Sequence, residues 1–238
     1  MAFKFISMAF QRQAAYRVEY FTGILNAFLY IFIFTSIWKA LIPEGGSMGG
    51  LGRSHMIAYA VLGTIIKVTF ARNDSLLGNR VKTGEIAVDL MKPYSIPFML
   101  FCDTVGTSLF HFLARAVPLL IFSIFFFDIR LPLDGAVLMA FFPVLLFSFA
   151  LFFLLSLFIS SMAFFFVEVF PFWIFYYALI TLASGAIIPI DFFPDLFKDL
   201  VLATPFPYLF YFPTMILIGK FTVFSYPQLL LQYAMQLM

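Results

Sequence analysis

The sequence has little charge and almost no cysteine, and both shortages exclude whole classes of protein. Of its 238 residues, 11% are charged and 63% are hydrophobic. Soluble domains carry about 25% charged and roughly 45–50% apolar residues, so this chain, with a mean hydropathy of +1.04, cannot hide its apolar surface in a water-soluble core. The single cysteine, Cys102, excludes an intrachain disulfide and a cysteine-based metal site.

The short motifs that carry catalysis or nucleotide binding are also lacking. The sequence contains no HExxH, GxSxG or CxxC, and Gly219-Lys220 lacks both the preceding glycine and the following Ser or Thr of a phosphate-binding loop. The net charge is +2 with no Lys/Arg run, which argues against a nucleic-acid partner. We therefore expect no catalytic residue, no metal site and no cofactor in this chain.

Apolar segments of membrane-spanning length are what the sequence has in abundance. A helix needs about 20 apolar residues to cross the hydrocarbon core. Five spans are expected, at 20–41, 56–71, 104–127, 136–165 and 169–188, and the stretch from Gln228 is too short to complete a sixth. The fourth segment exceeds what a bilayer requires and should tilt or bend. The predicted fold class is all-α, a polytopic transmembrane helical bundle that forms one domain over 1–238 and has the bilayer as its solvent.

Two further segments are expected to lie at the membrane surface. Residues 1–19 place apolar side chains on one helical stripe and basic ones elsewhere, which predicts an interfacial helix; the stripe is Phe3, Ile6, Phe10 and Ala14. Residues 189–213 hold five prolines among aromatics, too broken for a straight span. They predict a short re-entrant or interfacial hairpin.

Basic residues set the expected orientation. One group precedes the first span and a second lies between the second and third spans; they are Lys4, Arg12 and Arg17, then Arg72, Arg80, Lys82 and Lys92. Both groups fall on the same side if each span crosses once. The positive-inside rule places the N-terminus and the 72–97 loop in the cytoplasm.

The 72–97 loop contains a helical pattern between two spans. Ile86 and Leu90 are four residues apart and share a face, while Glu85 and Asp89 share the neighbouring face. Pro93 disfavours the α conformation in the residue before it and ends the pattern. The residues thus predict a short amphipathic helix over 83–92, able to dock in a groove of a soluble partner. A solvated connecting loop is the alternative that the pattern leaves open.

The same loop carries a resemblance to a known family. The run Lys82-Thr83-Gly84-Glu85-Ile86 and the run Asp89-Leu90-Met91-Lys92-Pro93 resemble the coupling segment of type 2 ATP-binding-cassette (ABC) exporter permeases. The order of interfacial helix, two spans, coupling segment and three more spans is similar as well. The run Ile188-Pro189-Ile190-Asp191-Phe192-Phe193-Pro194 is similar to the start of their extracellular hairpin.

This resemblance implies a permease subunit in the bacterial plasma (inner) membrane. It implies six spans, of which the last is cut short here, and a second permease subunit, identical or merely similar. A partner ATPase would hold ATP and Mg²⁺ and drive export of an amphipathic or lipid-like substrate by alternating access. The residues implied to couple the two proteins are Lys82, Gly84, Glu85, Ile86, Asp89, Leu90, Lys92 and Pro93.

One pair of ionisable residues falls inside an expected span. His111 and Arg115 are four apart and form a candidate intramembrane polar site, because charged groups in a membrane usually serve function or an internal partner. The alternatives are that Arg115 snorkels to the interface or pairs with Asp103 or Asp128.

Two other classes of function stay open on the residues alone. A secondary transporter or channel would need repeats or broken helices with mid-membrane charges, and no internal repeat is visible. A membrane-embedded enzyme would need polar groups converging at one depth, whereas most charges here fall at span ends.

Overall fold

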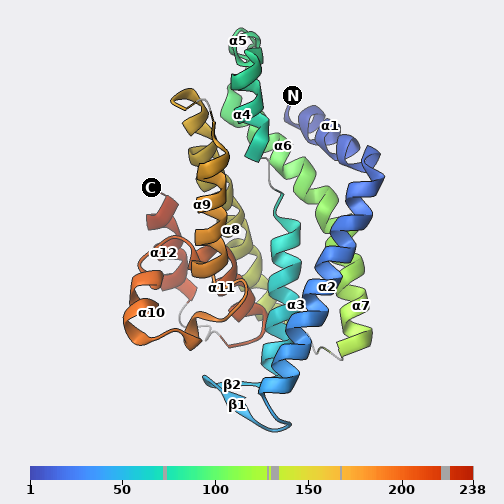
Figure 1. The fold of residues 1–238 in the computed structure, drawn as a ribbon, viewed down its shortest axis with the longest axis vertical. Helices are drawn as coiled ribbons and strands as arrows, with labels where there is room; N and C mark the ends of the chain where they lie inside the picture. The colour runs from blue at the N-terminus through green and yellow to red at the C-terminus, as the bar shows by residue number, and fades with distance from the viewer. Residues whose placement is uncertain (72–73, 128, 130–133, 167, 221–225, 238) are drawn as a thin grey trace.

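Helices form most of the part of the chain that the computed structural model describes, namely residues 1–71, 74–127, 129, 134–166, 168–220 and 226–237 (Figure 1). The all-α prediction is confirmed. The α-helices are α1 (Ala2–Ala15), α2 (Arg17–Leu41), α3 (Arg53–Thr69), α4 (Asp74–Thr83), α5 (Glu85–Leu90), α6 (Ile96–His111), α7 (Val117–Phe127), α8 (Gly135–Ser161), α9 (Phe170–Ala183), α10 (Asp195–Leu202), α11 (Pro207–Leu217) and α12 (Tyr226–Leu237).

Shorter elements complete these helices. A π-helical segment, η1 (Phe112–Ala116), joins α6 to α7, and 3-10 turns η2 (Met162–Phe164) and η3 (Ile190–Phe192) follow α8 and precede α10. Strands β1 (Ser47–Met48) and β2 (Leu51–Gly52) pair antiparallel around Gly49 and Gly50. Both glycines have positive φ, so the Gly-rich loop after the first span forms a tight hairpin.

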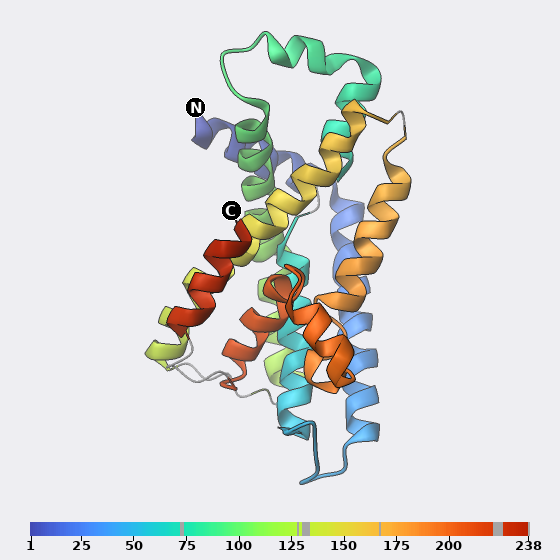
Figure 2. The same ribbon diagram turned by 90° about the vertical axis from the view of Figure 1, so that its left-hand side faces the viewer.

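The molecule is elongated, and different elements occupy its two ends. The α4–α5 pair lies at one end, with α1 just below it, and the β1–β2 hairpin lies at the other (Figures 1 and 2). The expectation that residues 1–19 and 72–97 share one side agrees with this arrangement. Arg72 lies outside the described residues.

Three helices of the described chain are long and apolar enough to cross a membrane. They are Val18–Leu41, Ile96–Phe127 and Gly135–Phe164, and the bent pair α10 and α11 makes a fourth if it counts as one span. The third expected span thus begins at Ile96, eight residues before its predicted start. The fourth expected span forms α8, which is inclined to α9 (Figure 2). Its tilt in the bilayer stays a prediction.

Two of the five expected spans are shorter helices, so the described residues do not confirm five complete spans. At about 1.5 Å per residue, the 17 residues of α3 extend roughly 25 Å. Helix α3 lies inside the bundle, and most of its residues from Met56 to Ile66 are buried. Helix α9 has 14 residues and ends at Ala183, before the predicted limit of the fifth span.

The backbone leaves the helix after α9 because tertiary contacts hold it in another path. Gly185 has a φ of 71°, and its carbonyl accepts a hydrogen bond from the buried Tyr59 hydroxyl. The Tyr211 amide donates to the Ser184 carbonyl at 3.1 Å. Irregular backbone at membrane depth is tolerated where the protein itself satisfies its polar groups.

The predicted hairpin at 189–213 is a pair of helices with very different environments. The chain bends by 104° between α10 and α11. Helix α10 exposes Leu196 and Leu200, whereas every residue of α11 from Pro207 to Ile216 is buried against α8 and α3. Helix α12 also packs on α8, where Ser148 and Tyr233 both donate to the Tyr208 carbonyl.

Candidate functional site

The predicted amphipathic helix exists, but it is the second half of a two-helix projection. Gly84 separates α4 from α5 with a φ of 78°, a conformation that favours glycine. Helix α5 ends at Leu90, and the Met91 and Lys92 amides close the last turn onto Val88 and Asp89. The predicted range of 83–92 therefore includes the turns on both sides of the helix, and Pro93 follows in an exposed bend.

Asp89 faces inward and joins the two helices. Its carboxylate accepts hydrogen bonds from Arg80 of α4 and from Lys92, the latter at 2.7 Å, and its side chain is 3% exposed. The hydrogen bond from Lys92, reinforced by Arg80, lowers the pKa of Asp89 although burial acts in the opposite direction. Glu85 lies exposed at the start of the helix. The two acids of the predicted acidic face thus have different surroundings.

Ile86 anchors α5 to the bundle. It packs against a cluster built on Leu77, Met99 and Leu100, which belong to α4 and α6. Phe5 of α1 and Phe153 of α8 pack on the same cluster. One apolar side chain of α5 is thereby connected to four other helices.

The large apolar side chains of α5 other than Ile86, and that of Met91 just after it, face outward. Val88 is 60% exposed, Leu90 67% and Met91 87%, and these three residues are called the apolar tip below. Leu90 does not share the inward environment of Ile86, because α5 ends there. The tip lies farther along the long axis of the molecule than α1 (Figures 1 and 2).

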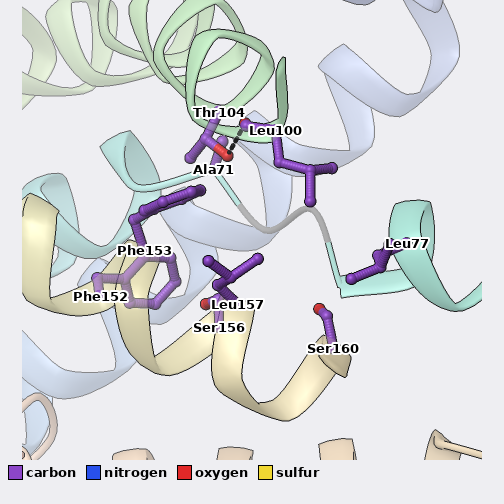
Figure 3. Close-up of a pocket in the computed structure, with 9 residues that line it drawn as sticks. All are labelled: Ala71, Leu77, Leu100, Thr104, Phe152, Phe153, Ser156, Leu157 and Ser160. Carbon is purple, nitrogen blue, oxygen red and sulfur yellow. Dashed lines mark hydrogen bonds between the residues drawn. The ribbon is translucent and has the colours of Figure 1, made fainter. Parts of the chain in front are cut away.

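A small pocket lies where α4, α6 and α8 meet (Figure 3). Its lining is mainly apolar, with hydroxyl groups from α6 and α8; the residues are Ala71, Leu77, Leu100, Thr104, Phe152, Phe153, Ser156, Leu157 and Ser160. Ser156 and Ser160 are one helical turn apart, so their small side chains leave room beside α4.

Lys82 and Lys92 make different contacts. Lys82 forms an ion pair with Glu168, just before α9, where both side chains are exposed. Lys92 pairs with Asp89 and lies 5.9 Å from the centre of the Tyr94 ring. Sequence reasoning missed Arg80 and Glu168 as partners. Gly84 is the signal in the sequence: if residues 74–90 are interpreted as two helices folded back at this glycine, Arg80 is predicted to lie near Asp89.

The His111–Arg115 pair lies beside the beginning of the first span. The Arg115 guanidinium donates to the Glu19 carbonyl at 3.3 Å and lies over Gly23 of α2. His111 is buried at the end of α6, where the π-helical segment begins. The part of α6 that precedes these residues runs beside α1, and the pair itself lies where α2 begins.

The two aspartates expected to pair with Arg115 were Asp103 and Asp128. The Asp103 carboxylate bonds Arg12 of α1 at 2.8 Å, and Asp128 lies outside the described residues. Within the described ranges no three His, Cys, Asp or Glu side chains gather closely enough to hold a metal ion.

A comparison against known families agrees with the helical membrane architecture. A family model described as "ABC-2 family transporter protein" matches residues 24–238, which include most of α2 and all later helices. No curated protein and no solved structure matches the chain significantly. With its apolar spans and its family match over most of its length, the chain belongs to the ABC-2 transporter family and is a membrane permease of an ABC transporter.

Proposed function

We propose that the chain is one half of the membrane pathway of a bacterial ABC exporter, driven by a separate ATPase subunit. In this proposal α1 and the α4–α5 projection lie on the cytoplasmic side of the inner membrane, as the basic residues favour. ATP and Mg²⁺ bind to the ATPase, and a second permease subunit completes the pathway. The aromatic-rich spans suit an amphipathic or lipid-like substrate.

The apolar tip is the observation that carries this proposal. Helix α1 exposes Phe3 and Met8 and suits the membrane interface, so it marks the level of the lipid surface. Helix α5, which carries the tip, lies farther along the long axis than α1 (Figure 2), so lipid at the level of α1 would not cover it. Large apolar side chains that project into water favour a protein partner with an apolar groove.

The contacts behind the tip supply a route for movement. Asp89 fixes α5 to α4 through Arg80, and Ile86 fixes α5 to the cluster formed by α4 and α6. Displacement of the tip by a closing ATPase would move α4 and α5 together and push on α1, α6 and α8. Rigid-body movement of this kind switches a transporter pathway between inward-facing and outward-facing states.

The decisive test is co-purification of the full chain with its ATPase from native membranes in mild detergent. Leu90→Glu combined with Met91→Glu places two charges in the apolar tip. We expect this variant to lose an ABC-type ATPase, and MgATP hydrolysis, that accompany the wild type. Leu196→Glu is the matched control, because Leu196 is 88% exposed on α10, which lies in the other half of the molecule from α5 (Figure 1).

The outcomes separate the proposal from its rivals. If the ATPase remains bound equally to the tip variant and to the control, the docking surface does not include the apolar tip. If no ATPase accompanies the wild type under any condition, the permease proposal fails, and a secondary transporter or channel becomes the better reading.

A further inference from the structure

One face of α4 contacts the connection between α8 and α9. Gly78 and Lys82 are one helical turn apart and so lie on the same face. Lys82 pairs with Glu168, and a Cβ placed on Gly78 would lie 4.0 Å from a methyl group of Val169. Because two neighbouring residues of one segment meet two neighbouring positions of one helix face, the contact has a defined register.

The other faces of α4 contact different elements. Leu77 and Val81, again four apart, pack in the apolar cluster with α6 and α8. Arg80 reaches the Asp89 carboxylate of α5. Helix α4 therefore connects the projection, the bundle and the beginning of α9.

Helix α9 is a peripheral element at this end. Its principal helical neighbour among the described elements is α8. Phe170 is 67% exposed and Phe175 65%, so much of the surface of α9 is left uncovered by the other described helices. The contacts of Glu168 and Val169 with α4 come directly before its first turn.

We propose that Gly78, Lys82, Glu168 and Val169, called the α4–α9 latch, make the first turn of α9 move as one body with α4. This inference rests on the proposed function and assigns α9 as a helix that the ATPase moves. An exposed ion pair alone is weak and is screened by salt. The latch also needs the close approach that Gly78 allows, because a large side chain there would push Val169 away.

The latch can be tested on the chain alone, by hydrogen exchange in lipid nanodiscs. Lys82→Glu opposes two negative charges, and we expect the amides of 168–173 to exchange about two- to fivefold faster, the range that an exposed pair supplies. Exchanging the charges, Lys82→Glu with Glu168→Lys, should restore the wild-type rate. Lys198→Glu is the matched control, because Lys198 pairs with Asp191 at the other end and should leave these amides unchanged. Unchanged exchange in Lys82→Glu overturns the latch.

Gly78 offers an independent variant. Gly78→Ala adds a methyl group at ordinary contact distance from Val169 and should leave exchange within about twofold, whereas Gly78→Phe should speed it as much as Lys82→Glu does. Equal exchange in the alanine and phenylalanine variants would contradict the close approach on which the latch depends.

The movement itself is tested in the complex with the ATPase. Lys82→Cys and Glu168→Cys are introduced with Cys102→Ala, and a short bismaleimide joins the two thiols. We expect MgATP hydrolysis to stay within about twofold of the untreated complex, because a joint that moves as one body tolerates a covalent link. The two single-cysteine variants, treated alike, control for modification.

Failure of the latch and failure of the proposed function give different results. Loss of hydrolysis only in the cross-linked complex means that the latch must open, and it overturns the inference while leaving the permease intact. Absence of an ATPase from the wild type defeats the proposed function, and the hydrogen-exchange result then decides the latch by itself.

Discussion

At the scale of single residues, Asp89 holds two helices and a following turn together with one carboxylate. Arg80 approaches it from α4 and Lys92 from the turn after α5, and the carboxylate is nearly inaccessible to water. Removing one partner of a buried charge costs more than removing an exposed one, because the remaining groups lose hydrogen bonds that water cannot fully replace. The projection should therefore depend on Asp89 more than on Glu85.

Asp89→Asn tests this dependence. It keeps the size of the side chain but removes the charge that both cations face. We expect the free energy of local opening of α5 to fall by about 1–3 kcal/mol, measured by hydrogen exchange over residues 85–92. Glu85→Gln, at an exposed position, should change it by less than about 0.5 kcal/mol. Equal effects of the two variants would mean that the buried contacts do not fix the helix.

The same carboxylate predicts a response to acid. Its pKa is lowered in the folded protein, chiefly by the hydrogen bond from Lys92. The stabilisation of the α4–α5 projection by the Asp89 carboxylate is therefore complete above the ordinary carboxyl pKa of about 4. It is lost as the pH falls through the lowered pKa of Asp89. A fluorophore on Met91→Cys, in a Cys102→Ala background, should report constant mobility from pH 7 to about 5 and a rise only below about 4. Asp89→Asn should remove this acid step; a step that persists would belong to another group.

At the scale of elements, α1 is joined to α6 by a close approach of backbones. A Cβ on Gly106 would overlap the Ile6 carbonyl oxygen and lie 2.9 Å from the Cβ of Ala9. The Arg12–Asp103 ion pair lies beside this contact. Helix α1 therefore packs as part of the bundle.

Two glycine variants separate a rigid contact from a yielding one. Gly106→Ala meets backbone, which cannot rotate away, and should destabilise the protein by about 1–3 kcal/mol. Gly23→Ala meets the end of the Arg115 side chain, 2.7 Å from its Cζ, which can move, so we expect a loss within about 1 kcal/mol. Thermal unfolding in detergent measures both. A larger loss for Gly23→Ala would indicate that Arg115 is held more rigidly than α1.

Sequence periodicity predicted which elements exist better than what they contact. The stripe on residues 1–19 is divided between two surroundings: Ile6 and Phe10 are partly covered by the bundle, whereas Phe3 and Ala14 are exposed. Likewise Ile86 is packed while Leu90 projects. Periodicity identifies one face of a helix, but the length of the neighbouring helix decides how much of that face is covered.

Span limits were the least predictable feature, because hydropathy reports apolar length and not position. Helix α6 begins at Ile96 and runs beside α1, and Arg115 contacts the Glu19 carbonyl at the beginning of α2. Gly185 ends the helical path after α9 through a tertiary bond to Tyr59, 126 residues away in the chain. Nothing local in the sequence signals such a partner.

At the scale of the whole molecule, the long axis separates two chemically different ends. The α4–α5 end carries Arg80, Lys82 and Lys92, whereas the opposite end carries the Gly-rich β1–β2 hairpin (Figure 1). Lys4 and Arg12 of α1 add to the Lys and Arg residues at that end. Fewer lie around the hairpin, where Arg53 pairs with Glu44 and Lys220 donates to the Gly50 carbonyl. The positive-inside rule acts on this difference in the number of Lys and Arg residues. The two ends should therefore face different compartments.

Thiol labelling of one residue at each end tests this orientation. Met91, 87% exposed in the apolar tip, and Met48, 47% exposed in β1, are each replaced by cysteine in a Cys102→Ala background. An impermeant maleimide should label Met48→Cys in spheroplasts and Met91→Cys only in inside-out vesicles, because the apolar spans between them keep the reagent on one side. The reverse pattern would place the projection outside the cell, away from any ATP-hydrolysing partner. Labelling of both residues from one side would mean that the long axis does not cross the membrane.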